Sequence, residues 1–277
     1  MPGRTHHPHR TNVRPRPKRR QPRPALWRLL PAVACLSAAT FAAPAPGRGV
    51  KYDLPPGAVL VESRAVRTRR GERRLLLLWV LSPTRHRRDP AEAYTCPEET
   101  RGSHYSGPTR VSLADGRTGR ILNTVEVRDA HGGEDSFDLP FRIRAGGYYH
   151  VPGRRAGREG RPAIMHLKDY NGDGRALEFA LYDAWACMGL ETALIGYSER
   201  RDRVVQYPVH LTIRGGRERE SVSPWADYLF ARRPASPGRW RYQIDYRGRG
   251  GSLDSYEVSY DRRGERFVGS LTFTNQP

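Results

Sequence analysis

Short apolar runs of strand length, separated by polar turns, most strongly constrain the fold of this 277-residue chain. They recur from Ala58 to Thr274, and no long amphipathic helix pattern interrupts them. Runs of this length with turn signals between them are typical of antiparallel β-sheets. The sequence therefore predicts an all-β protein, with strands expected at 58–66, 75–81, 110–113, 121–127, 141–144, 148–151, 164–167, 178–183, 193–197, 204–213, 240–246, 256–260 and 267–274.

Polar turns predict how some of these strands are joined. Three hairpins are expected, with turns at 114–119, 198–202 and 261–265. The strands around 164–168, 178–183, 192–197 and 203–211 would together make a four-stranded unit of the propeller-blade type. We therefore expect a propeller-like arrangement, with a two-sheet β-sandwich as the alternative. A chain of this length is enough for one domain, which we expect to cover residues 46–277.

One stretch, residues 169–178, carries a pattern that points to a metal. Asp169, Asn171 and Asp173 stand at alternate positions, and Gly174 follows directly. Short carboxylate and amide side chains at this spacing can surround a hard cation, while the glycine takes the sharp turn. An EF-hand is disfavoured, because its twelfth position is a Glu, whereas here that position is alanine and Glu178 is tenth. The Asn-Gly and Asp-Gly dipeptides are also strong turn signals, so a metal-free connection is the alternative.

A strand, this turn and a second strand resemble the calcium loops of FG-GAP/VCBS repeats, the integrin-α-type propeller modules, over residues 164–211. The positions that match the family pattern are Asp169, Asn171 and Asp173, and Arg175 would offer its backbone carbonyl. The family usually has an acidic residue at the ninth position, where this chain has leucine and places Glu178 one residue later. The resemblance implies calcium as the cofactor and Glu178 as the candidate for the last ligand.

The N-terminal residues 1–45 have the composition of an export signal. The first 28 residues carry nine Lys or Arg and no acid, and the stretch Leu29–Ala43 is apolar or small throughout. A basic segment, an apolar stretch and small residues after it are the marks of a secretory signal peptide. The apolar stretch is shorter than the ~20 residues that span a bilayer, so an uncleaved anchor is the lesser alternative. We expect a secreted or periplasmic protein, with no membrane span after signal removal and no nucleic-acid partner.

The net charge of +19 is divided almost equally between this N-terminal segment, with +9, and the exported part, with +10. Nine of the 48 basic residues precede the apolar stretch, and all 29 acidic residues lie at or beyond Asp53. A basic exported protein can adhere to acidic surfaces outside the cell. We expect a cell-surface polysaccharide or another exported protein as the partner, with a solvated arginine-rich surface as the alternative.

The cysteines predict one cross-link. Cys35 lies in the signal segment, which leaves Cys96 and Cys187 in the exported part. An even pair in an exported chain is most simply a disulfide. Two separate buried thiols are the alternative.

No catalytic motif stands out in the sequence. Neither a GxSxG nucleophile elbow nor an HExxH zinc motif occurs. Asp245, Asp254 and Glu257 would be candidates for the acid pair of a glycosidase. Aromatic residues would offer a sugar-stacking face, with core packing as the alternative; they are Tyr148, Tyr149, Trp225, Tyr228 and Trp240.

The sequence leaves two functional hypotheses. The leading one is an exported, calcium-stabilised β protein with a binding or scaffolding role and no catalysis. The alternative is an exported carbohydrate-active hydrolase that uses carboxylates at strand ends.

Overall fold

The computed structural model of the chain describes residues 51–86, 104–130, 143–144, 147–148, 164–185 and 189–274. All of them belong to the compact unit Ala43–Pro277. The predicted signal peptide, Cys96, Cys187 and Tyr149 lie outside the described residues. The export signal and the disulfide therefore stay predictions.

Three sheets make up most of the described part of the chain. The first sheet has the order β1 (Ala58–Arg67), β2 (Arg73–Leu81), β5 (Thr109–Asp115) and β6 (Ile121–Val127). In the middle sheet, β10 (Gly189–Ser198) pairs with β9 (Glu178–Trp185), β11 (Arg203–Tyr207) and β14 (Trp225–Asp227). The third sheet has the order β13 (Arg219–Ser223), β12 (Val209–Arg214), β17 (Arg266–Thr274), β16 (Leu253–Asp261) and β15 (Arg239–Asp245).

Smaller elements complete the described structure. Two short pairs lie apart from the three sheets, β3 (Thr84–His86) with β4 (His104–Ser106) and β7 (Ile143–Arg144) with β8 (Gly147–Tyr148). Two single 3₁₀ turns are η2 (Leu229–Ala231) and η3 (Arg247–Arg249). Among the described residues, no helix is long and apolar enough to cross a membrane.

The all-β prediction is confirmed, and so are the three predicted hairpins. The turns at 114–119, 198–202 and 261–265 join β5 to β6, β10 to β11 and β16 to β17 as antiparallel pairs. The strand expected at 164–167 does not form, and only one bridge, from Lys168 to Glu178, pairs this segment with β9. A strand needs partners on its backbone groups, which here hydrogen-bond to the side chain of Glu62 instead.

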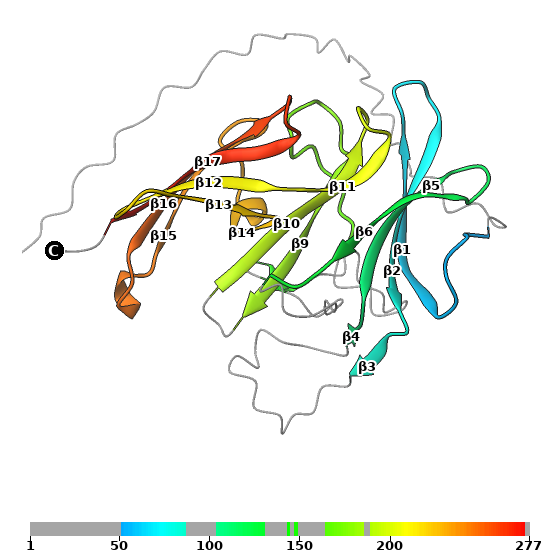
Figure 1. Cartoon of the computed structure of the whole chain (residues 1–277), viewed down its shortest axis with the longest axis horizontal. Helices are drawn as coiled ribbons and strands as arrows, with labels where there is room; N and C mark the ends of the chain where they lie inside the picture. Colours follow the sequence, from blue (N-terminus) through cyan, green and yellow to red (C-terminus); the bar gives the residue numbers. More distant parts are fainter. Residues whose placement is uncertain are drawn as a thin grey trace, which may run out of the picture. The chain divides into compact units, whose positions relative to one another are not determined.

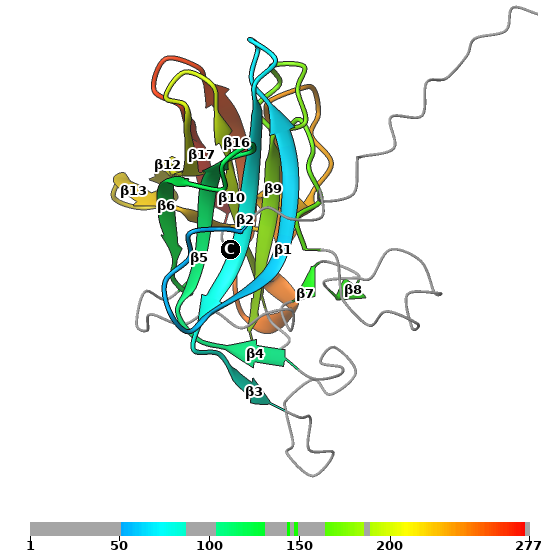
Figure 2. The same ribbon diagram turned by 90° about the vertical axis from the view of Figure 1, so that its right-hand side faces the viewer.

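The middle sheet lies between the first and the third sheet, as Figure 1 shows. Alternate residues of its strands point to opposite faces. Phe179 and Ile195 pack into a core with the first sheet, whereas Ala180 and Leu194 pack into a second core with the third sheet. In Figure 2 the strands of the first sheet lie in front of β9 and β10. A sheet buried on both faces explains the nearly continuous apolar run of β10.

The third sheet is mixed, because β12 and β17 run parallel and every other pair is antiparallel. Parallel strands need a long connection, and here β13 to β16 lie between them in the chain. The run expected at 204–213 divides at Pro208, so that β11 belongs to the middle sheet and β12 to the third.

The expected propeller blade forms in part. Three of its four strands, β9, β10 and β11, are neighbours in the middle sheet, in the order of the chain. The fourth is represented only by the bridge at Lys168. The propeller-like arrangement itself stays a prediction.

Candidate functional site

The 169–178 loop closes on itself through the carboxylate of Asp169. Its Oδ1 accepts hydrogen bonds from the backbone N–H groups of Gly172 and Asp173, at 2.7 and 3.1 Å. Its Oδ2 accepts one from Gly174 at 2.9 Å. As predicted, Gly174 takes the sharp turn, with φ of +90°, a conformation that side chains with a Cβ rarely adopt. Asp169 thus orders the loop before any ion is bound.

The loop is also fixed from outside by a close contact with another turn. A Cβ on Gly172, whose φ is +74°, would lie 2.7 Å from the carbonyl carbon of Pro237. The guanidinium of Arg262 donates a hydrogen bond of 2.9 Å to the carbonyl of Gly172. Only glycine permits this approach, so the loop has little room to shift.

Glu178, the first residue of β9, reaches back into the loop and is completely buried. Its carboxylate accepts hydrogen bonds from the backbone N–H of Tyr170 at 3.1 Å and from the side-chain amide of Asn171 at 2.9 Å. Burial raises the pKa of Glu178 to about 8, with the charges of Asp173 and Asp169 adding to the effect. The negative electrostatic potential around Glu178 therefore favours the binding of a cation.

The predicted ligands are of the chemical types that calcium binds, but they are not yet positioned around one point. Asp169, Asp173 and Glu178 offer carboxylate oxygens, the donors that calcium prefers, and among the described residues none of the three forms an ion pair with Lys or Arg. The described part of the chain, however, holds no group of three acidic, His or Cys side chains already gathered around one point. The carbonyl of Arg175 accepts a hydrogen bond from Leu177 at 3.1 Å. Calcium would have to draw these groups together.

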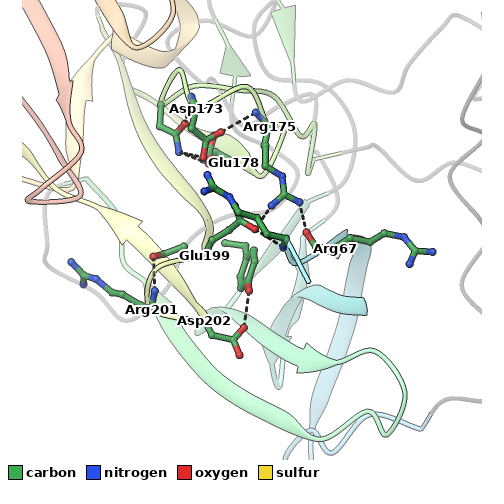
Figure 3. A network of polar contacts seen from close by, with 11 residues as sticks. Arg67, Asp173, Arg175, Glu178, Glu199, Arg201 and Asp202 are labelled. Atoms are coloured by element: carbon green, nitrogen blue, oxygen red, sulfur yellow. Dashed lines mark hydrogen bonds and ion pairs between the residues drawn. The ribbon is translucent and has the colours of Figure 1, made fainter. Parts of the chain in front are cut away.

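The side chain of Arg175 leaves the loop and joins a separate network of ion pairs (Figure 3). It donates to the carboxylate of Glu199 and to the carbonyl of Arg67. Glu199 also accepts from the backbone N–H and the Nε of Arg69, both at 2.9 Å. Burial alone would raise the pKa of Glu199, but the hydrogen bonds and charges of Arg175 and Arg69 lower it. The network ties the loop to the β1–β2 hairpin and to the end of β10.

A pocket of about 440 Å³ opens beside the loop, and Asn171 and Asp173 both line it. We call it the loop pocket. Three other lining residues, Ser198, Tyr207 and Glu265, are at most 8% exposed. The carboxylate of Glu265 accepts hydrogen bonds from Ser198 and Arg201 and also pairs with Arg200. Although burial opposes it, these partners lower the pKa of Glu265.

Asp169 lines a different pocket, of about 350 Å³, together with Lys168, Phe230 and Arg232. The carboxylates of Asp169 and Asp173 thus line two separate pockets. This division is one reason why the predicted ligands are not already gathered around one point.

The acids proposed for hydrolysis lie outside the two pockets described above. Asp245 is exposed and paired with Arg247, whose hydrogen bonds lower the pKa of Asp245 to about 2. Glu257 is exposed and paired with Arg241 at 2.8 Å. Asp254 is buried and accepts a hydrogen bond from a serine hydroxyl. None of the three lines either of the two pockets described above.

The proposed sugar-stacking aromatics lie mostly in the cores. Trp225 and Trp240 are 6% and 2% exposed and belong to the first and second core, respectively. Tyr228 is half-buried beneath the guanidinium of Arg232. The side chains of Tyr148 and Tyr149 lie outside the described structure. Core packing, the alternative considered from sequence, is therefore correct for both tryptophans.

Three residues of the site were not singled out by sequence: Glu199, Tyr207 and Glu265. Glu199 and Glu265 lie in polar hairpin turns, where a carboxylate is ordinary. Tyr207 lies at the end of β11, where an aromatic residue is equally ordinary. No local pattern marks them, because their neighbours in space come from distant parts of the chain.

Comparison of the chain with protein-family models, with curated proteins and with solved structures found no match. The function must therefore be argued from the residues themselves.

Proposed function

We propose that the chain is an exported β protein, secreted or periplasmic, that is stabilised by calcium in the 169–178 loop and binds a partner without catalysis. The observation that carries the calcium proposal is the set of carboxylates of Asp169, Asp173 and Glu178. They share one loop, Glu178 is fully buried, and none of the three pairs with Lys or Arg in the described structure. A buried carboxylate without a cationic partner, such as that of Glu178, is costly, and a divalent cation would offset that cost.

The loop offers five groups to calcium. They are the side chains of Asp169, Asn171, Asp173 and Glu178 and the carbonyl of Arg175. Calcium takes six to eight oxygen ligands in flexible geometry, so water would complete the shell. The positive charge would favour the ionised form of Glu178, and the loop is already ordered by the hydrogen bonds to Asp169.

A binding role is better supported than hydrolysis. A glycosidase needs one carboxylic acid whose pKa is raised, facing a second carboxylate across the substrate. In the loop pocket, the pKa values of Glu199 and Glu265 are lowered instead, and both carboxylates are held by arginines. Such groups stabilise the walls of a pocket and cannot serve as proton donors near neutral pH. A cell-surface polysaccharide or another exported protein is the partner we propose.

The calcium proposal is tested by thermal unfolding of the full chain with calcium and with a chelator. Calcium at about 100 times its dissociation constant should stabilise the protein by ~2.7 kcal/mol, which raises the melting temperature. Asp173→Ala should abolish most of this rise. Asp245→Ala, which removes an exposed aspartate outside the loop, should keep it. A wild-type melting temperature that does not respond to calcium contradicts the proposal.

A further inference from the structure

We propose that the loop pocket binds a neutral saccharide of one or two sugar units, and this inference rests on the binding role proposed above. The first observation is the hydroxyl of Tyr207. The residue is 1% exposed and lines the pocket, and among the described residues nothing donates to or accepts from its hydroxyl. Its oxygen is not one of the fully buried side-chain atoms that lack a hydrogen-bond partner. It therefore stays open to the pocket, where a ligand hydroxyl can bond to it.

The ring of Tyr207 is held rigidly, so its hydroxyl is presented at a fixed point. It packs edge-on against Tyr260 and Phe267, with ring centroids 5.9 and 6.2 Å apart. Tyr260 lines the same pocket and is only partly buried. A fixed donor and a partly exposed aromatic ring are the features that orient a sugar, whose faces are apolar and whose edges are hydroxyls.

The charges of the pocket favour a neutral ligand. Three arginines and three carboxylates line it. Each arginine is already engaged, since Arg69 pairs with Glu199, Arg200 pairs with Glu265, and Arg262 donates to the carbonyl of Gly172. The three positive charges of the pocket are thus matched by three negative ones, and an acidic ligand would meet the carboxylate of Asp173.

Hydrogen-bonding groups of both kinds remain for the ligand. Asp173 accepts at Oδ1 from the backbone N–H of Arg175, while among the described residues its Oδ2 has only a long contact of 3.5 Å with the amide of Asn171. That oxygen accepts from a sugar hydroxyl, and Tyr207 donates to another. The pocket volume of about 440 Å³ lies at the small end of the range for ligand sites. This size is enough for one or two sugar units.

The site is coupled to the loop, because Asp173 belongs to both. If calcium repositions the carboxylate of Asp173, a different oxygen of this carboxylate faces the pocket. Calcium and saccharide then change each other's affinity by the same factor.

The experiment is saturation-transfer NMR on the full chain with maltose, cellobiose, lactose and N,N′-diacetylchitobiose, and with digalacturonate as the acidic comparison. Calorimetry with the strongest binder then gives the affinity, in calcium and in chelator. We expect at least one neutral disaccharide to bind and digalacturonate to bind more weakly. Absence of binding by all four neutral sugars at millimolar concentration, the weak end of measurable affinity, overturns the proposal. So does a preference for digalacturonate.

Two variants separate a binding role from a structural one. Tyr207→Phe should weaken binding about ten-fold, since it removes one hydrogen bond to the ligand. Its melting temperature should not fall, because the hydroxyl has no partner in the described protein. Tyr256→Phe is the control, because it removes a hydroxyl that donates to Asp227 at 2.9 Å away from the pocket. It should lower the melting temperature and leave the affinity unchanged.

The two proposals fail separately. If Tyr207→Phe weakens sugar binding but calcium does not change the melting temperature, the sugar-binding pocket is supported and the calcium site is overturned. If the melting temperature depends on calcium but no sugar binds, the calcium site is supported and the sugar-binding proposal is overturned. Equal sugar affinity of the wild type and Tyr207→Phe overturns the assignment of this hydroxyl.

Discussion

The side-chain amide of Asn171 donates a hydrogen bond of 2.9 Å to the buried carboxylate of Glu178. This contact joins the turn of the loop to the first residue of β9. The same carboxylate also accepts from the backbone N–H of Tyr170. Glu178 therefore holds the loop in place through two donors from largely buried residues.

Replacement of Glu178 by alanine should be strongly destabilising. It would leave the N–H of Tyr170 and the amide of Asn171 buried without an acceptor. An unsatisfied buried donor costs about 1–3 kcal/mol, so we expect the free energy of unfolding to fall by at least 2 kcal/mol. Urea denaturation in the presence of a chelator measures this loss without a contribution from calcium.

Glu257→Ala is the matched control for that variant. Glu257 is exposed on β16, and its ion pair with Arg241 is on the surface. Its removal should change the free energy of unfolding by less than about 0.5 kcal/mol. Equal effects of the two substitutions would mean that the buried position of Glu178 is wrong.

The ion pair between Arg175 and Glu199 should contribute measurably to stability. Both side chains are partly buried, at 27% and 15% exposure, so water screens the pair less than a surface pair. A double-mutant cycle with Arg175→Ala and Glu199→Gln should give a coupling energy of about 0.5–1 kcal/mol. The exposed pair of Arg241 and Glu257 should give less. Additive effects of the two substitutions would show that the loop is not anchored through this contact.

A row of acidic residues across three strands should make stability depend on pH. Glu191 on β10 is opposite Asp183 of β9 and Asp227 of β14. Burial raises the pKa of Glu191 to about 7, and repulsion from Asp227, Asp183 and Asp129 adds to this. The unfolded chain has the lower pKa, so the folded state binds the proton more tightly. The stability contributed by this proton is complete below about pH 4.5 and is lost as the pH rises through about 7.

Glu191→Gln tests that dependence. The variant cannot ionise, so its stability relative to the wild type should increase between pH 5 and 8. Because the side chain is partly solvated, we expect a gain of about 1 kcal/mol rather than the full value of the shift. Urea midpoints at pH 5, 6, 7 and 8 measure it. If the urea midpoints of the wild type and of Glu191→Gln change with pH in parallel, Glu191 is not the cause of the pH dependence.

Strand positions were largely predictable from the sequence, because they depend on local patterns. The turn at 261–265, for example, is marked by polar residues and glycine between two apolar runs, and it joins β16 to β17. The prediction of a strand at 164–167 was wrong. Its apolar pattern is real, since Ile164 and Met165 are buried, but its backbone bonds to Glu62 and not to a neighbouring strand. Periodicity reports burial and does not report the hydrogen-bonding partner.

The site was predictable only in part. Asp169, Asn171, Asp173 and Glu178 were found because they lie within ten consecutive residues. Tyr207 and Glu265 reach the same pocket from β11 and from the β16–β17 turn. Their approach depends on the pairing of the third sheet, including the parallel pair of β12 and β17, which no local window contains. The pocket was therefore visible only in three dimensions.

The most direct test of calcium in the 169–178 loop is a crystal structure grown with calcium, with anomalous diffraction data. We predict an anomalous peak surrounded by oxygens of Asp169, Asn171, Asp173 and Glu178 and by the carbonyl of Arg175, at about 2.3–2.6 Å. A loop without such a peak at saturating calcium, with the carboxylate of Asp169 bonded only to the backbone N–H groups of Gly172, Asp173 and Gly174, would contradict the calcium site.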